Sequence, residues 1–129
     1  MPSRYHLKSK SILIVDDDRV IRLILRKHLT KLGMVIVGEA ATGLDGAYMY
    51  DKYHPDIVLL DVQMPKGNGL TILRLIHEIN PKALVIMLTG DTAEDVIKNA
   101  INLGAKDYIS KRADDLPERL AESIQKIIK

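Results

Sequence analysis

The sequence predicts an α/β protein with a doubly wound, five-stranded parallel sheet and five helices. Short apolar runs alternate with helical patterns along the chain, which is typical of successive strand–helix units. The runs are apolar almost throughout rather than at every second position, as expected for strands that are buried on both faces. With 129 residues, 47% of them apolar and 28% charged, the chain fits a single domain that buries its own core.

Each element can be placed in order from this alternation. Strands are expected at 11–16, 34–39, 56–61, 83–88 and 106–109. Helices are expected at 18–32, 43–53, 68–79, 92–103 and 115–128. Asp18, Asn68 and Asp115 are candidate N-caps of the first, third and fifth helix, and Gly33 is placed to end the first helix in a left-handed conformation.

Composition narrows the class of protein. The absence of cysteine excludes disulfides and thiolate zinc sites and agrees with a reducing compartment. No apolar run is long enough to span a membrane, and residues 1–9 lack the apolar middle of a signal peptide. We therefore expect a cytoplasmic protein without membrane insertion, in which residues 1–9 form a flexible arm. A net charge of +2 is too small to indicate nucleic-acid binding, and the basic positions of the first helix are interpreted as a solvated face.

Acidic residues stand at the ends of two expected strands. Asp16, Asp17 and Asp18 follow the first apolar run, and Asp61 follows the third. In an open parallel sheet, the functional cleft lies beyond the carboxyl ends of the strands, where the winding direction reverses. Carboxylates that crowd together there need a cation. We therefore expect Asp16 and Asp17 to share a Mg²⁺ with Asp61, while Asp18 serves as a helix cap.

Residues that suit phosphoryl transfer to a carboxylate stand at the ends of the other strands. Asp61 is the candidate nucleophile, because it would be ionised and accessible at the tip of a strand. Lys111 supplies a mobile positive charge and Thr89 a hydroxyl donor, while Gly90 leaves the approach clear of a side chain. Such chemistry depends mostly on positioning and on electrostatic stabilisation, which these residue types provide.

The whole pattern resembles one family. The segments ILIVDDD at 12–18, DVQMPKGNG at 61–69, LTG at 88–90 and GAKDYISK at 104–111 are similar to those of the receiver domain of two-component response regulators, including the single-domain chemotaxis type. The resemblance implies a flavodoxin-like receiver fold over residues 10–129, with strand order 2-1-3-4-5. It also implies a phosphoprotein that catalyses its own phosphorylation and dephosphorylation rather than a conventional enzyme.

The resemblance assigns roles to the acidic residues. It implies that Asp61 accepts a phosphoryl group from a sensor histidine kinase or a histidine phosphotransfer protein. It further implies that Asp17, Asp61 and the backbone carbonyl of Gln63 bind Mg²⁺ directly, with Asp16 acting largely through water.

The resemblance also implies a switch. Thr89 would move toward the phosphoryl group and Tyr108 would rotate inward, while Lys111 would form an ion pair with the acyl phosphate and Gly90 would border it. A downstream effector protein would then bind the face made by the helix at 92–103, the strand at 106–109 and the helix at 115–128. Direct nucleic-acid binding is not expected, and a homodimer that forms on phosphorylation is left open.

The chain departs from the family pattern after Lys111, where Arg112 replaces the proline of most receivers. A cis peptide bond before a residue other than proline costs ~2.5–4 kcal/mol. We therefore expect either a trans bond with an altered loop at 110–114 or a strained cis bond. By family behaviour, Gln63 and Asp91 would tune the rate of dephosphorylation.

Three alternatives stay open from the sequence. A phosphatase similar to the haloacid dehalogenases would use Asp16 as the nucleophile. A binding module would keep the fold without needing phosphate. Finally, the chain could be the receiver fragment of a longer DNA-binding regulator, although we expect a single-domain regulator.

Overall fold

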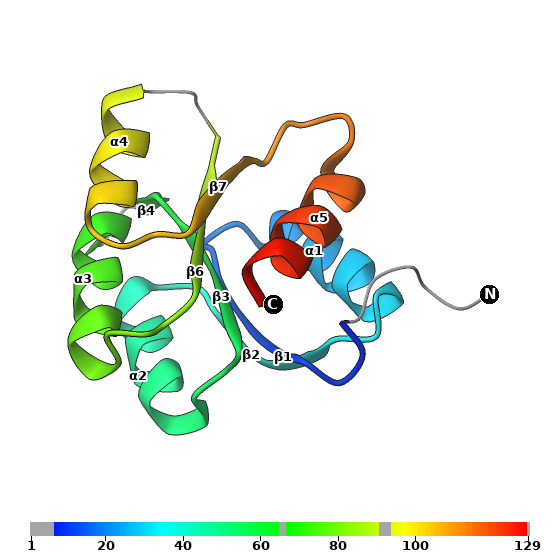
Figure 1. The fold of residues 1–129 in the computed structure, drawn as a ribbon, viewed down its shortest axis with the longest axis horizontal. Helices are drawn as coiled ribbons and strands as arrows, with labels where there is room; N and C mark the ends of the chain where they lie inside the picture. Colours follow the sequence, from blue (N-terminus) through cyan, green and yellow to red (C-terminus); the bar gives the residue numbers. More distant parts are fainter. Residues whose placement is uncertain (1–6, 65–66, 91–93, 129) are drawn as a thin grey trace.

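A central parallel sheet organises the fold in the computed structural model, which describes residues 7–64, 67–90 and 94–128 (Figure 1). Its strands are β1 (Ser11–Val15), β2 (Val35–Ala40), β3 (Ile57–Asp61), β6 (Val85–Thr89) and β7 (Asp107–Ser110). They lie in the order β2-β1-β3-β6-β7, and every neighbouring pair is parallel. Counted along the chain without the two strands of a short separate hairpin, this is the predicted order 2-1-3-4-5.

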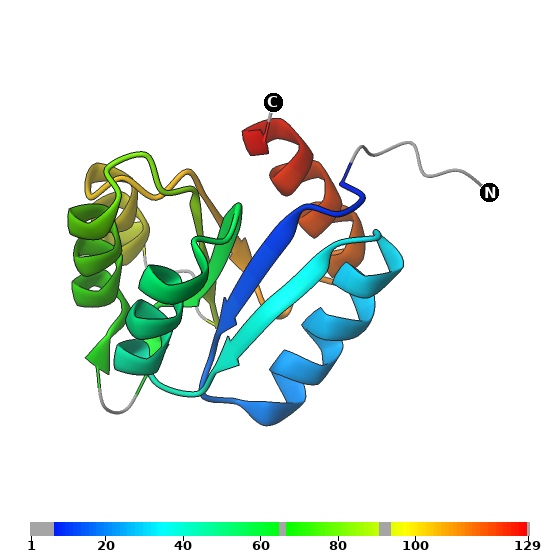
Figure 2. The same cartoon turned by 90° about the horizontal axis from the view of Figure 1, so that it is seen from below.

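Helices cover both faces of the sheet, as expected for a doubly wound fold. Within the described ranges they are α1 (Arg19–Lys31), α2 (Gly43–Tyr53), α3 (Gly69–Ile79), α4 (Glu94–Asn102) and α5 (Leu116–Ile128). Helices α1 and α5 lie on one face, and α2, α3 and α4 lie on the other (Figures 1 and 2). The predicted fold class is therefore confirmed.

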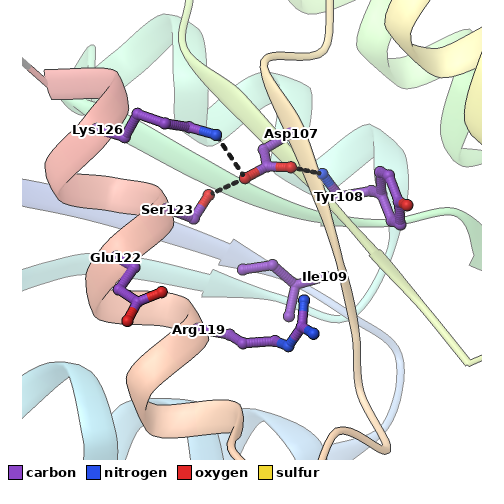
Figure 3. A pocket seen from close by; sticks show the side chains of 7 residues that line it. All are labelled: Asp107, Tyr108, Ile109, Arg119, Glu122, Ser123 and Lys126. Carbon is purple, nitrogen blue, oxygen red and sulfur yellow. Dashed lines mark hydrogen bonds and ion pairs between the residues drawn. The ribbon is translucent and has the colours of Figure 1, made fainter.

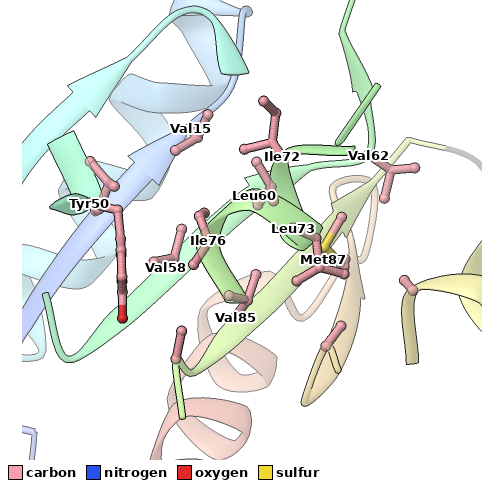
Figure 4. Packing of buried hydrophobic residues seen from close by; sticks show 14 of the residues in the cluster. Val15, Tyr50, Val58, Leu60, Val62, Ile72, Leu73, Ile76, Val85 and Met87 are labelled. Atoms are coloured by element: carbon pink, nitrogen blue, oxygen red, sulfur yellow. The ribbon is translucent and has the colours of Figure 1, made fainter. Parts of the chain in front are cut away.

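Two buried apolar clusters fill the space between the sheet and its helices. Strands β3 and β6 are buried along their whole length, so that alternate residues contribute to opposite clusters. Val58 and Leu60 pack toward α2 and α3, where Tyr50 and Ile76 complete the cluster shown in Figure 4. The residues between them pack toward α1 and α5. Burial on both faces explains why these runs are apolar without alternation.

Capping residues begin and end the helices where the sequence indicates. The Asp18 side chain accepts hydrogen bonds from the backbone N–H groups of Val20 and Ile21, so it is the N-cap of α1. Gly33 follows α1 with a φ of 83°, a left-handed conformation that favours glycine. Asn68 and Asp115 directly precede α3 and α5, and their capping role stays a prediction.

Two parts of the prediction need correction. The arm was expected to include residues 7–9, but Leu7 is fully buried in the cluster under α1 and α5, and the Ser9 N–H donates to the carbonyl of Gly33. Residues 1–6 lie outside the described residues. A short antiparallel hairpin of β4 (Gln63–Met64) and β5 (Gly67–Asn68), which was not predicted, leads from Asp61 into α3.

Candidate functional site

The carboxyl ends of four strands bring the predicted site residues to one edge of the sheet. Asp16 follows β1, Asp61 ends β3, Thr89 ends β6 and Lys111 follows β7. Backbone hydrogen bonds continue the strand pairing past these ends: the Asp16 N–H donates to Ala40 at 3.0 Å, and the Lys111 N–H donates to Thr89 at 2.9 Å. The sheet itself therefore fixes the backbone of the site.

Three carboxylates form an acidic cluster at this edge. One oxygen each of Asp16, Asp17 and Asp61 lies within 4.8 Å of the others. Asp16 is completely buried and Asp61 is 2% exposed, whereas Asp17 is exposed. The Asp18 side chain is engaged in capping α1 and does not belong to the cluster.

Lys111 reaches into the cluster from β7. Its Nζ lies 2.7 Å from Oδ2 of Asp16 and 3.0 Å from Oδ2 of Asp61, and the lysine side chain is only 14% exposed. The Oδ1 atoms are held by backbone N–H groups instead: Asp18 donates to Asp16 at 2.9 Å and Gln63 donates to Asp61 at 3.0 Å. The two carboxylates are thus fixed in orientation through one oxygen each.

The electrostatics of the site favour a further cation. Burial raises the pKa of Asp61 to about 6; the contact with Lys111 opposes this rise and the charge of Asp16 adds to it. Burial by itself would lower the pKa of Lys111, but its hydrogen bonds to Asp16 and Asp61 outweigh burial and raise it. At neutral pH one ammonium group therefore faces three carboxylates, and the excess charge is negative.

The donor set fits a hard divalent cation. The two Oδ2 atoms of Asp16 and Asp61 are buried and paired with the Lys111 ammonium, and no other donor reaches them among the described residues. Oxygen ligands of this kind are those that Mg²⁺ prefers. Gln63 stands two residues after Asp61, in β4, and its carbonyl as a further ligand stays a prediction.

The residues assigned to switching lie at different depths. Thr89 is 6% exposed at the end of β6, whereas Tyr108 on β7 is 44% exposed. Figure 3 shows the Tyr108 ring on the side of β7 away from α5, while the Asp107 carboxylate points toward α5. A Cβ at Gly90 would meet no atom within 4 Å in the described part of the chain, so this position is open. The inward rotation of Tyr108 stays a prediction.

Arg112 stands directly after Lys111, where most receivers were expected to have proline. The peptide bond between Lys111 and Arg112 is trans, so the expected cis alternative is wrong, and the altered loop at 110–114 stays a prediction. Ser110 supports the turn, because its Oγ accepts from the Arg112 N–H and its carbonyl accepts from the Ala113 N–H, both at 3.2 Å. The trans bond still delivers the Lys111 ammonium to the acidic cluster. Asp91, expected to tune dephosphorylation, lies outside the described residues.

Two residues near the site were missed by the sequence reasoning. A Cβ on Gly69 would lie 2.3 Å from the carbonyl oxygen of Asp61, so only glycine lets α3 begin this close to the end of β3. Glycine at the end of the segment 61–69 was a signal for such a close approach. Arg22 on α1 donates from Nη1 to the carbonyl oxygen of Asp16 at 2.6 Å, a contact that no spacing in the sequence reveals.

The class of protein follows from comparison once this geometry is known. The family model described as the response regulator receiver domain matches residues 12–125. The chain therefore belongs to the receiver domain family of two-component response regulators.

Individual relatives indicate which type of receiver domain the chain is. The chain is 36% identical over 120 residues to the chemotaxis protein CheY of Thermotoga maritima, covering 93% of this chain and 98% of that protein. It is 38% identical over 117 residues to the protein CcdB of Bacillus subtilis, covering 91% and 96% of the two chains. Among solved structures, it superposes with a TM-score of 0.88 on a chain of the CheX-CheY-BeF3-Mg+2 complex from Borrelia burgdorferi, at 31% identity over 95% of this chain and 91% of that one. The chain is thus a receiver of the chemotaxis type.

Family membership bears on the alternatives. It speaks against a phosphatase in which Asp16 is the nucleophile, and the buried Asp16 carboxylate is already engaged by Lys111 and by the Asp18 N–H. None of the helices in the described ranges combines the length and the apolar character that crossing a bilayer requires.

Proposed function

We propose that this chain is a phosphorylation-activated response regulator in which Asp61 is the phosphoacceptor. The observation that carries the proposal is the position of Asp61: its carboxylate ends the central strand β3, shares a cluster with Asp16 and Asp17, and lies 3.0 Å from the Lys111 ammonium. The phosphoryl donor is the phosphohistidine of a sensor histidine kinase or a histidine phosphotransfer protein.

The reaction needs few protein groups. An oxygen of Asp61 forms a bond to phosphorus, the bond between phosphorus and the donor imidazole nitrogen breaks, and the electron pair returns to that nitrogen. Lys111 balances charge on the phosphoryl oxygens, and the Thr89 hydroxyl at the end of β6 donates to one of them. Asp17, Asp61 and the Gln63 carbonyl would hold Mg²⁺, with Asp16 acting largely through water, and the bound ion would supply charge neutralisation and orientation.

The site imposes a pH dependence on this reaction. The pKa of Asp61 is raised to about 6, so that the carboxylate loses nucleophilic character as the pH falls through this value. The same cluster supports self-catalysed hydrolysis of the acyl phosphate, and the resemblance to the family implies that Gln63 and Asp91 tune the rate of this hydrolysis.

Phosphorylation changes the output face, which we define as α4, β7 and α5. The added charge draws Thr89 and Lys111 toward the phosphoryl group, and movement at the end of β7 reaches Tyr108. On this face a pocket of about 350 Å³ lies between β7 and α5, with the side chains of Arg119, Glu122 and Lys126 along it (Figure 3). A downstream effector protein binds here, or a second copy of the chain after phosphorylation. We expect the regulator to act in the cytoplasm.

Phosphotransfer from purified kinases tests the proposal. The wild type, Asp61→Asn and the matched control Asp51→Asn, which removes an exposed acid from α2, are incubated with radiolabelled histidine kinase in the presence of Mg²⁺ or EDTA. We expect label on the wild type and on the control, only with Mg²⁺, and none on Asp61→Asn. Label on Asp61→Asn equal to that on the wild type would refute the assignment. Effector binding that Asp61→Asn and EDTA leave unchanged would favour a phosphate-independent binding module.

A further inference from the structure

Arg22 lies on α1 next to the acidic cluster and takes no part in the proposed phosphoryl transfer. Its Nη1 donates to the carbonyl oxygen of Asp16 at 2.6 Å. The side chain is only 17% exposed, although it is a long cation on a surface helix. A guanidinium group bound to the main chain next to the cluster suggests a positional role.

Glu39 holds this guanidinium group from β2. Its Oε1 lies 3.7 Å from Nε of Arg22. Its other oxygen accepts a hydrogen bond from Nε of Arg26 at 2.6 Å and also pairs with Nη2 of that residue. Glu39 directly precedes Ala40, whose carbonyl accepts from the Asp16 N–H. Arg22 therefore joins α1, β2 and the turn at Asp16.

Asp17 depends on this turn for its position. Its side chain is exposed and makes no hydrogen bond or ion pair with any residue in the described ranges. The residues on either side are held: the Asp18 N–H donates to Oδ1 of Asp16, and the Asp18 side chain caps α1. The carbonyl oxygen that Arg22 binds belongs to the peptide plane that joins Asp16 to Asp17. The direction of the Asp17 carboxylate is thus set by its backbone, and Arg22 holds that backbone.

We propose that Arg22 is a positioning residue of the metal site: by fixing the Asp16–Asp17 peptide plane, it keeps the Asp17 carboxylate within reach of those of Asp16 and Asp61. This inference rests on the proposed function, because it assigns Arg22 a role in Mg²⁺ binding.

A positioning role and a simple charge effect predict opposite changes in Mg²⁺ affinity when Arg22 is removed. Arg22 is a cation close to a site for a divalent cation, so its removal should by Coulomb repulsion alone make Mg²⁺ bind more tightly. A positioning role predicts weaker binding instead. Loss of a group that orients a metal ligand typically lowers affinity by ~10–100-fold. We expect roughly 10-fold here, because Arg22 acts through the main chain and leaves the ligands themselves intact.

The test is Mg²⁺ titration by calorimetry on the wild type, Arg22→Ala, Arg22→Lys and Arg19→Ala. Arg19 is exposed at the start of the same helix, and its side chain makes no hydrogen bond or ion pair with a described residue, so Arg19→Ala is a control for the loss of one charge. Arg22→Ala and Arg22→Lys should both bind Mg²⁺ roughly 10-fold more weakly than the wild type. A lysine does not restore binding, because a single ammonium group cannot contact the Asp16 carbonyl and Glu39 at the same time as the planar guanidinium group does. Arg19→Ala should bind as well as the wild type or slightly better.

Thermal unfolding without Mg²⁺ separates positioning from stability. Mg²⁺ affinity of Arg22→Ala that equals or exceeds that of the wild type would overturn the inference, even if the metal-free variant melts earlier. Full affinity in Arg22→Lys would also overturn it, and this variant decides the question should Arg22→Ala fail to fold. Absence of Mg²⁺ binding in the wild type itself would overturn the proposed function as well, which distinguishes the two failures.

Discussion

Replacing Asp61 with asparagine should stabilise the metal-free protein at neutral pH. Burial raises the pKa of Asp61 from its usual 3.8 to about 6; Lys111 opposes this rise, and the charge of Asp16 adds to it. The folded state therefore disfavours the ionised carboxylate, whereas the unfolded chain does not. Asparagine has nearly the same shape and carries no charge, so it removes this penalty.

The magnitude follows from the rise in pKa. A difference of one between the folded and unfolded pKa corresponds to about 1.4 kcal/mol. The rise in the pKa of Asp61 therefore sets an upper limit of about 3 kcal/mol on the stabilisation by asparagine. Water at the open side of the cluster screens part of this, and we expect a gain of about 1.5 kcal/mol in the free energy of unfolding. Because the pKa is higher in the folded state, the wild type takes up a proton first as the pH falls through about 6. The extra free energy of unfolding of Asp61→Asn therefore reaches its maximum above about pH 7 and decreases toward pH 3.8, the usual pKa of the carboxylate.

Urea unfolding followed by circular dichroism in EDTA checks this prediction. The wild type, Asp61→Asn and the control Asp51→Asn are compared at about pH 7.5 and about pH 4.5, so that the titration of carboxylates outside the acidic cluster cancels. The advantage of Asp61→Asn should shrink by more than half at the lower pH. The control should differ from the wild type by no more than about 0.5 kcal/mol. The electrostatic reasoning would be refuted if Asp61→Asn were less stable than the wild type. It would also be refuted if the difference in the free energy of unfolding between the two proteins were the same at both pH values.

Three further predictions concern single side chains. Gly69→Ala places a Cβ 2.3 Å from a carbonyl oxygen and should cost about 2 kcal/mol in urea unfolding, whereas Gly90→Ala should stay within about 0.5 kcal/mol; equal effects would disprove the steric argument. Lys111→Met leaves two buried carboxylates without their cation, so the metal-free protein should lose about 3 kcal/mol and bind Mg²⁺ more tightly by calorimetry. Weaker Mg²⁺ binding would mean that the lysine does not compete with the metal. Ser123→Ala removes the 2.7 Å hydrogen bond to Asp107 that joins α5 to β7 and should cost about 1 kcal/mol without changing phosphoryl uptake; loss of uptake would place Ser123 in the reaction.

The sheet could be predicted because its signal is local and strong. Apolar runs such as 57–60 are uninterrupted since both faces of the strand are covered, and this run ends at a polar residue, Asp61, at the carboxyl edge of the sheet. The same logic located the acidic cluster, because parallel strands place their carboxyl ends at one edge. Asp16, Asp61 and Lys111 meet there as expected.

The parts that escaped prediction depend on contacts between distant segments. The two-residue strands of the hairpin at 63–68 are too short to show any periodicity. Leu7 stands in a basic segment, and only the space under α1 and α5 explains its burial. The contact of Arg22 with the Asp16 carbonyl depends on a side-chain conformation, so the sequence shows only a basic residue on a helix. In each case the feature depends on the tertiary structure, which the local sequence pattern does not reveal.

Chemical mapping of the phosphorylated residue tests the central claim most directly. The protein is phosphorylated with acetyl phosphate in the presence of Mg²⁺, the acyl phosphate is reduced with borohydride, and the modified peptide is sequenced by mass spectrometry. The account predicts modification at Asp61 that disappears with EDTA. Modification at Asp16 or Asp17 in place of Asp61, or equal modification of Asp61 without a divalent cation, would contradict it.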